Sequence, residues 1–304
     1  MVDLSGEWVK LEDWDLVLSI HDIVLREFGN KSLQYTDTVG APEAREELRR
    51  VLSRHGFYKH EVIFTTSLSD SIRFVAAAFL DGGDCIYPED PTQREVLKYA
   101  NCGRPKAVYI QPIWRNPDGY IYDIVELDKM AAKAPVVIYD LTYSLMTEGV
   151  QPRGRVTIAV GSLHPYFPGL HLGFVAVPNE LFDLFVNLIE STYLHSPTYV
   201  QYVMYVAFKN RAVEKAMVEF RRREKLAREY IEGVTTPFFI WFKTREKSKF
   251  IKQGAQIGSV FSWRGGYRDF IRLGLVSASE GELAEFFSKV FTKEFQSGGD
   301  SGEF

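Results

Sequence analysis

The sequence has few cysteines, no long apolar run and no excess of positive charge, and each absence excludes a class of protein. Cys85 and Cys102 occur without CxxC or Cys/His spacing, which predicts two reduced, partly buried thiols and no metal site. A disulfide between them would require the fold to bring them together. No stretch is long enough to span a bilayer, and residues 1–22 are too acidic for a signal peptide. The net charge of −4 argues against nucleic acid binding. We therefore expect a soluble, cytoplasmic protein that contacts neither membrane nor nucleic acid.

The middle of the chain alternates short apolar runs with amphipathic segments. The runs at 61–66, 84–89, 106–112, 135–140, 155–161 and 172–178 predict strands. The segments at 70–81, 91–100 and 123–134 predict helices, the first capped by Ser69 or Asp70. Such alternation predicts an α/β fold, a mainly parallel sheet sandwiched by helices. In these sheets ligands bind beyond the carboxyl ends of the strands.

The pattern changes after residue 179 and predicts a second, smaller α+β domain. Helices are expected at 179–193, 196–210, 212–232 and 280–295, and strands at 237–244, 255–263 and 269–277. The basic run at 221–228 contains Glu224 and lies in a helical pattern, so it predicts a solvated helix face. The expected division is an arm at 1–34, a large domain at 35–210, a small domain at 211–295 and a disordered tail at 296–304.

Six short motifs occur in one order along the chain. They are LQYTDTVGAPEAREELRRVL (33–52), GGDCIYPEDPT (82–92), RNPDG (115–119), IYDLTYS (138–144), PGLHLGF (168–174) and FIRLGLVSASEGEL (270–283). This succession resembles the class I/II aminotransferases, enzymes of fold type I that use pyridoxal phosphate (PLP). The resemblance covers roughly residues 33–290, and it is stronger for the fold than for the function because several functional positions differ.

The resemblance assigns roles to five residues of this chain. Asp140 would keep the pyridine nitrogen of PLP protonated, which makes the cofactor an electron sink. Tyr143 and Asn116 would meet the phenolic oxygen of the ring. Arg272 would clamp a substrate carboxylate, a task that suits its planar fork of donors. Tyr35 would reach the phosphate of a neighbouring subunit, which implies a homodimer.

Each of these residues also has an ordinary structural interpretation. Asp140 could cap a turn, Tyr143 could be a core residue, and Arg272 could form an interior ion pair. Asn116 opens a good turn sequence, with or without a ligand. Taken singly, Asn116 and Tyr35 favour the structural interpretation. Taken together with the Asp-x-x-Tyr spacing, the set favours inheritance from a cofactor site.

The covalent anchor of the cofactor is missing from the place that the resemblance gives it. In this family a lysine four residues before the proline of the PGL motif forms the Schiff base with PLP. His164 occupies that place here, or Leu163 or Pro165 if the alignment shifts by one residue. No lysine occurs between Tyr139 and Asn179.

Three further cofactor positions are altered as well. His171 replaces the arginine that holds the phosphate, and Ser67 replaces the usual glycine of the phosphate turn. Gln93 stands where an aromatic ring would stack on the pyridine. The remaining phosphate donors are Ser69, Ser162 and the backbone N–H groups of the helix near residue 70. The sequence thus predicts that PLP or pyridoxamine phosphate (PMP), where bound at all, is held without a covalent link.

Three hypotheses follow. The first is a degenerate aminotransferase, a pseudoenzyme that binds a carboxylate or an amino acid through Arg272. The second is a dehydratase-like enzyme that uses noncovalent PLP or PMP with His164 as the base. The third is a functional aminotransferase whose lysine comes from elsewhere, such as Lys243. His164 and His171 could equally be loop or core imidazoles without a ligand. We prefer the first hypothesis because four cofactor positions are altered together.

Overall fold

The computed structural model describes residues 2–6, 8–100, 103–149, 151–233 and 236–291. The tail that the sequence predicts to be disordered, 296–304, lies outside this part, as does the end of the predicted closing helix. None of the described helices is long and apolar enough to cross a membrane.

The larger sheet has six strands, and all but one run in the same direction. Its strands are β1 (His60–Thr65), β2 (Asp84–Tyr87), β3 (Arg104–Ile110), β4 (Val136–Asp140), β5 (Val156–Ser162) and β6 (Gly173–Pro178). They lie in the order β1-β6-β5-β4-β3-β2. Strand β6 is antiparallel to both of its neighbours, and the remaining pairs, β2·β3, β3·β4 and β4·β5, are parallel. The prediction of a mainly parallel α/β sheet is confirmed.

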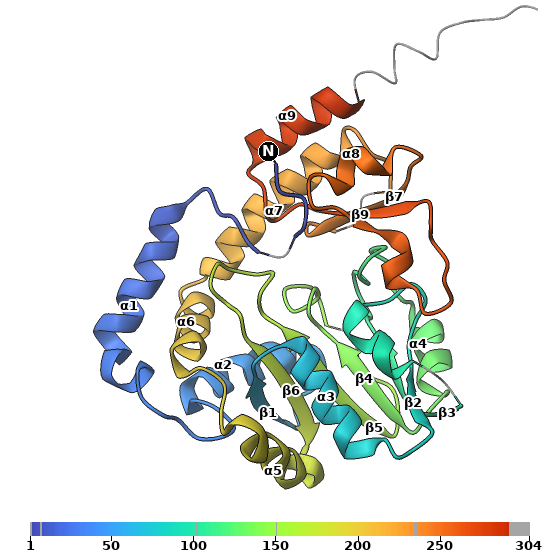
Figure 1. Cartoon of the computed structure of the whole chain (residues 1–304). Helices are drawn as coiled ribbons and strands as arrows, with labels where there is room; N and C mark the ends of the chain where they lie inside the picture. Colours follow the sequence, from blue (N-terminus) through green and yellow to red (C-terminus); the bar gives the residue numbers. More distant parts are fainter. Residues whose placement is uncertain (1, 7, 101–102, 150, 234–235, 292–304) are drawn as a thin grey trace, which may run out of the picture.

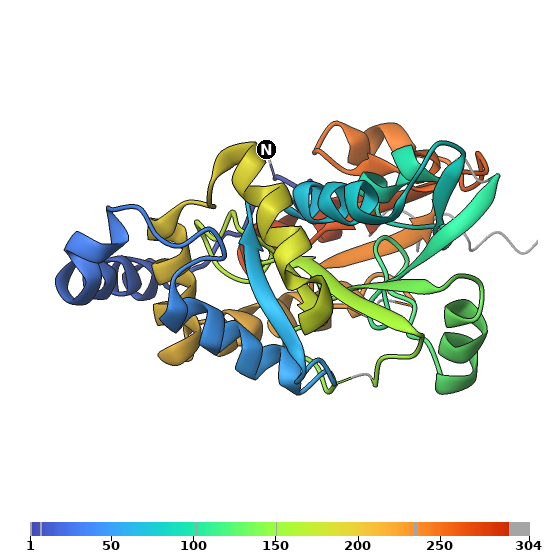
Figure 2. The ribbon, with the colours of Figure 1, turned by 90° about the horizontal axis from the view of Figure 1, so that it is seen from below.

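Helices cover both faces of this sheet, so its strands are buried on both sides (Figures 1 and 2). In β1, Ile63 packs into the core under α3 (Leu68–Phe79) and α5 (Phe182–Tyr193), and Phe64 packs into the core on the opposite face. The opposite face is covered by α2 (Pro42–Ser53), α4 (Ile124–Ala131) and α6 (Thr198–Lys209). Two short 3-10 helices also lie in this part of the chain: η1 (Arg94–Tyr99) follows β2, and η2 (Asn179–Leu181) directly precedes α5. Burial on both faces explains the nearly continuous apolar runs of these strands.

A second sheet of three strands packs with the C-terminal helices. It consists of β7 (Phe239–Lys243), β8 (Gln256–Ile257) and β9 (Phe270–Gly274) in the order β7-β9-β8. The helices are α7 (Ala212–Arg228), α8 (Lys247–Ile251) and α9 (Glu280–Phe291), and η3 (Gly258–Phe261) follows β8. The prediction of one strand over 255–263 is wrong, because the chain turns into η3 after two strand residues. The segment predicted as a helix at 91–100 is the 3-10 helix η1.

Two local predictions in the large sheet are corrected by the structure. The cap of α3 is Ser67, not Ser69 or Asp70: its extended backbone (φ −165°, ψ 168°) lets the hydroxyl accept from the backbone N–H of Asp70 at 3.2 Å. Cys85 is buried and disulfide-bonded, so the expectation of a reduced thiol is wrong for this residue. Cys102 lies outside the described residues.

The N-terminal segment crosses the second sheet before it forms α1 (Trp14–Ser32), a helix that projects along one side of the molecule (Figure 1). The backbone of Leu4 donates to Gln253 and accepts from Gly274. Gly6 lies so close to β9 that a Cβ added to Gly274 would stand 2.4 Å from the Cα of Gly6. The two glycines therefore allow the N-terminal segment to lie directly against the strand that carries Arg272.

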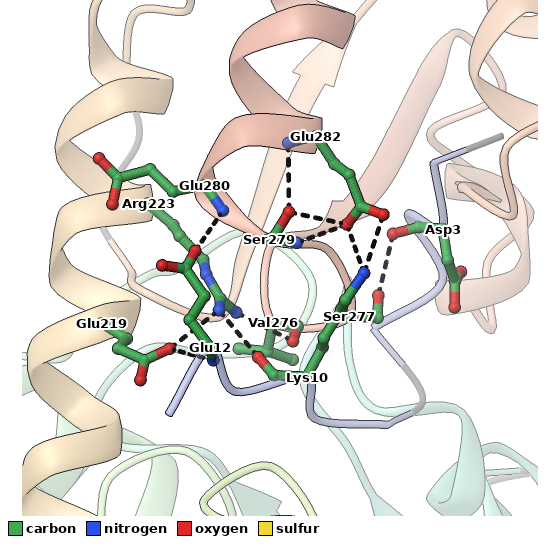
Figure 3. Close-up of polar contacts among 10 residues, drawn as sticks. All are labelled: Asp3, Lys10, Glu12, Glu219, Arg223, Val276, Ser277, Ser279, Glu280 and Glu282. Carbon is green, nitrogen blue, oxygen red and sulfur yellow. Dashed lines mark hydrogen bonds and ion pairs between the residues drawn. The ribbon is translucent and has the colours of Figure 1, made fainter. Parts of the chain in front are cut away.

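A buried arginine ties the N-terminal segment to α7 and to the chain after β9 (Figure 3). Arg223 is fully buried, so the prediction of a solvated face for the basic run 221–228 is wrong for this residue. It donates to the backbone carbonyls of Lys10 at 2.8 Å and Val276 at 3.1 Å, and to the Glu219 carboxylate at 3.2 Å. Glu219 also accepts from the backbone N–H of Glu12 at 3.0 Å. A buried guanidinium needs such acceptors because desolvating a charge is costly.

Candidate functional site

A small cavity of about 130 Å³ lies at the carboxyl ends of four parallel strands. Its lining from the large sheet comes from the segments that follow β2, β3, β4 and β5, and the residues are Gln93, Arg94, Glu95, Asn116, Tyr143 and His164. The carboxyl ends of parallel strands meet at one edge, so residues distant in sequence converge there. The structure thus brings together four of the residues that the sequence singled out.

The opposite wall comes from the N-terminal segment and the second sheet. Ser5 and Gly6 line it from the segment, and Gln256, Phe261 and Arg272 line it from β8, η3 and β9. With this wall in place, the volume of the cavity is smaller than the roughly 300–1,000 Å³ usual for ligand pockets. Only a small ligand fits the space in this arrangement.

Arg272 is buried, with 4% of its surface exposed, and its guanidinium is held by neutral acceptors. Its Nε donates to Asn116 Oδ1 at 2.6 Å, its Nη1 to the Ser5 carbonyl at 3.1 Å, and its Nη2 to the Tyr143 hydroxyl at 3.3 Å. The guanidinium carbon lies 4.8 Å from the centre of the Phe239 ring. Since the bonded partners are uncharged, the positive charge of Arg272 is not neutralised by a carboxylate among them.

Asn116 is fixed in place from several directions. It precedes a cis bond to Pro117, and its backbone N–H donates to Gln111 Oε1 at 3.1 Å. Its side-chain nitrogen donates to Gln93 Oε1, so the residue that stands in the place of the stacking aromatic is bonded to the wall instead. The side-chain oxygen of Asn116 accepts from Arg272 Nε and so orients the guanidinium.

Asp140 ends β4 and is buried, and it is not among the residues that line the cavity. Its carboxylate accepts from the Tyr109 hydroxyl and from the backbone N–H of Thr142 at 2.8 Å. The hydroxyl of Thr142 donates to it as well. Burial raises the pKa of Asp140 to about 6, and these hydrogen bonds oppose that shift. Both carboxylate oxygens therefore already have donors from the protein.

A chain of hydrogen bonds connects Asp140 to His164 across β4 and β5. The Thr142 hydroxyl that donates to Asp140 accepts from the backbone N–H of Ser162 at 3.1 Å. The Ser162 hydroxyl lies 2.9 Å from His164 Nδ1. Loss of hydration, followed by the charges of Arg272 and His171, lowers the pKa of His164 to about 4. The imidazole facing the cavity is therefore neutral at neutral pH.

Glu95 places a carboxylate in the same cavity. It lies at the start of η1, two residues after Gln93, and lines the space with Arg272. Its Oε2 is buried and has no hydrogen-bond partner in the part of the chain that the structure describes. Its negative charge contributes to raising the pKa values of both Asp140 and Tyr143. The sequence reasoning missed Glu95, although the charged residue beside the altered stacking position was a visible signal.

Four residues considered in the sequence analysis lie away from the cavity lining. Ser69 is half-buried in the first turn of α3, and His171 is exposed. Tyr35 is 82% exposed and packs edge-on against His195, with ring centres 5.2 Å apart. Lys243, the candidate for a displaced lysine, is exposed at the end of β7. Among the described lining residues there is no lysine, and no described group of His, Cys, Asp and Glu is arranged to hold a metal ion.

These residues fit PLP poorly in this arrangement. The ring-side residues Asp140, Tyr143 and Asn116 are present, but the residues predicted at the phosphate, Ser69, Ser162 and His171, do not line the cavity. A dianionic phosphate requires positive charge or a set of N–H donors. Glu95 instead adds a negative charge to a space that is small for a phosphorylated ring.

No family model matches the sequence. An uncharacterised aminotransferase of Saccharolobus solfataricus is 24% identical in an alignment that covers 73% of this chain and 67% of the relative. The structure matches an archaeal alanine:glyoxylate aminotransferase with a TM-score of 0.79 at 19% identity, over 97% of this chain and 91% of the other. It matches the kynurenine aminotransferase of Pyrococcus horikoshii, solved with PMP, with a TM-score of 0.76 at 18% identity, over 99% and 92% of the two chains.

Proposed function

We propose that this chain, which resembles the class I/II aminotransferases in sequence and fold, keeps the family's carboxylate-binding arginine and has lost transamination. The observation that carries the proposal is the composition of the cavity. Arg272, Asn116 and Tyr143 line it together, and the position facing them from the end of β5 holds His164. The protein would then bind a small carboxylate or amino acid without changing it.

The bonding of Arg272 supports carboxylate binding. One of its donors is engaged by the backbone carbonyl of Ser5, which is a neutral acceptor. A ligand carboxylate forms charge-assisted hydrogen bonds about twice as strong as neutral ones, so it can displace this carbonyl. Asn116 holds the guanidinium through Nε at 2.6 Å and leaves the two terminal nitrogens directed to other acceptors. Arg272 is therefore oriented before the ligand arrives.

The properties of His164 support the loss of transamination. An imidazole cannot replace a lysine amine in forming a Schiff base. Its pKa of about 4 also makes it a weak base at neutral pH. Lys243 is exposed at the end of β7 and does not line the cavity, which disfavours the hypothesis of a displaced lysine.

The test combines cofactor trapping with ligand titration. After incubation with equimolar PLP and borohydride, we expect no reduced adduct at a lysine that reaches the cavity, as mapped by peptide mass spectrometry. Calorimetry should detect propionate or pyruvate binding, and Arg272→Gln should weaken it at least tenfold. Arg268→Gln, an exposed arginine just before β9, is the matched control and should leave the affinity unchanged. A PLP adduct that borohydride fixes stoichiometrically to one lysine within reach of the cavity would refute the proposal.

A second candidate function is PLP- or PMP-dependent chemistry with His164 as the base. It is favoured by one observation: the imidazole lines the cavity, and Ser162 fixes its orientation through Nδ1. The altered phosphate positions and the pKa of about 4 count against it. Reversible PMP binding that is lost in His164→Ala would favour this candidate over the first.

A further inference from the structure

We propose that Glu89 is a positioning residue that acts on Arg272 without touching it, and that the affinity of the site depends on whether the Glu89 carboxyl group is charged. The inference rests on the proposed function, in which a ligand carboxylate binds Arg272. It adds to that function a residue from the segment after β2 that does not line the cavity.

A continuous series of hydrogen bonds connects Glu89 to Arg272. Glu89 Oε2 accepts from the backbone N–H of Gln111 at 3.1 Å and from Gln111 Nε2 at 3.4 Å. The side-chain amide of Gln111 also contacts both polar groups of the Asn116 backbone: Oε1 accepts from the N–H at 3.1 Å, and Nε2 donates to the carbonyl at 3.4 Å. Asn116 Oδ1 then accepts from Arg272 Nε at 2.6 Å. All four residues are 4% exposed or less, so the loss of any of these bonds leaves a buried polar group unpaired.

Arg115 connects the charge of Glu89 to Asn116 by a second route, because Arg115 and Asn116 are neighbours in the chain. The Arg115 guanidinium is bound by Asp118, with Nε 2.9 Å from Oδ1, and its Nη1 donates to the Tyr122 hydroxyl at 3.2 Å. A neutral Glu89 leaves this arrangement undisturbed. A charged Glu89 would compete with Asp118 for the guanidinium, and a displacement of Arg115 would move Asn116 with it.

The surroundings of Glu89 favour the neutral carboxyl group at neutral pH. The titratable groups that face it are those of Tyr109, Arg115, Asp118 and Tyr122. Burial raises the pKa of Glu89 to about 8, although the positive charge of Arg115 opposes this shift. Burial also raises the pKa of both tyrosines, so they stay neutral. Glu89 therefore carries a proton at neutral pH and loses it as the pH rises through about 8.

The neutral form of Glu89 is the form that favours a carboxylate ligand. A negative charge at Glu89 would reduce the positive potential at Arg272 and draw Arg115 away from Asp118. The affinity for a simple carboxylate should therefore fall as the pH rises through about 8. Because such coupling is reciprocal, a bound carboxylate should also raise the pKa of Glu89.

The experiment follows propionate binding to the full chain by calorimetry from about pH 7 to about pH 9.5, a range in which propionate stays ionised. The affinity of the wild-type protein should fall at least roughly fivefold, the lower end of the usual coupling between sites. Glu89→Gln keeps the shape of the side chain but cannot ionise, so its affinity should stay constant across the range. Glu89→Ala removes an acceptor of Gln111 and should weaken binding already at about pH 7. Glu190→Gln, an exposed glutamate on α5, is the matched control and should keep the wild-type pH dependence.

Infrared spectroscopy reports the state of Glu89 without a ligand. The absorption of a protonated carboxyl group should decrease over the same pH range in the wild type and in Glu190→Gln, and this change should be missing from Glu89→Gln.

The outcomes separate this inference from the proposed function. Propionate binding that is lost in Arg272→Gln, but has the same pH dependence in the wild type and in Glu89→Gln, refutes only the role of Glu89. Absence of Arg272-dependent binding at every pH refutes both. If Glu89→Gln fails to fold by circular dichroism, the wild type decides. The decrease of the carboxyl absorption and the fall in affinity must then have the same midpoint, and separate midpoints overturn the inference.

Discussion

The buried guanidinium of Arg223 allows a quantitative prediction about the N-terminal segment. Replacing it in Arg223→Met keeps a long side chain of good helix propensity in α7 but removes the charge and every donor. The backbone carbonyls of Lys10 and Val276 lose the donor that lay 2.8 Å and 3.1 Å away, and Glu219 loses its ion-pair partner. The result is a buried carboxylate without its cation (Figure 3).

The expected loss of unfolding free energy is about 3 kcal/mol. Removing one partner of a buried ion pair typically costs about 3–5 kcal/mol. The lower end applies here because Glu219 keeps the backbone N–H donors of Glu12 and Asp13, at 3.0 Å and 3.4 Å. Such a loss is a large part of the roughly 5–15 kcal/mol by which a protein of ordinary stability is folded.

Urea denaturation followed by circular dichroism measures this change. The control is Arg222→Met, because the neighbouring Arg222 forms an exposed ion pair with Glu280 at 3.2 Å and should contribute less than about 1 kcal/mol. The double variant Arg223→Met with Glu219→Met should recover part of the loss, since both charges are then absent. The reasoning fails if Arg223→Met costs no more than Arg222→Met.

Two further predictions concern protonation and assembly. Burial lowers the pKa of His164 to about 4 in the folded chain. Between pH 6.5 and 4 the unfolded chain therefore binds a proton that the folded chain does not. The contribution of His164 to the free energy of unfolding should fall as the pH falls through that range. His164→Gln should flatten the dependence of unfolding free energy on pH there, and identical slopes would contradict the prediction. Tyr35, 82% exposed, remains available to a second copy of the chain, and we predict a homodimer by light scattering that Tyr35→Ala weakens; a monomer at all concentrations would contradict this.

Sequence patterns predicted the elements of the large sheet well because both faces of its strands are buried. The apolar runs around β1, β4 and β6 follow from this burial, and each predicted strand is present within a few residues. The second sheet was less predictable: β8 is only two residues long and continues as η3, although the spaced apolar residues of 255–263 resemble those of a strand. Local hydrophobicity cannot distinguish these two outcomes when packing against β9 decides them.

The sequence predicted residues of the candidate site only where they belong to a short recognisable motif. The resemblance of their motifs to those of the aminotransferases was the reason to expect that Asn116, Tyr143 and Arg272 converge, and all three line the cavity. Glu95 was missed because its role depends on η1, which turns its side chain toward a wall built from other elements.

The sequence by itself determined the absence of lysine between Tyr139 and Asn179 and the alternation that produces a mainly parallel sheet. Only the tertiary structure decided that the Ser5 carbonyl binds Arg272 and that a carboxylate and a guanidinium face one small space. The physical reason is that periodicity reports which face of an element is buried. The partners of a buried polar atom come from segments hundreds of residues away, and only their packing determines whether that atom is satisfied.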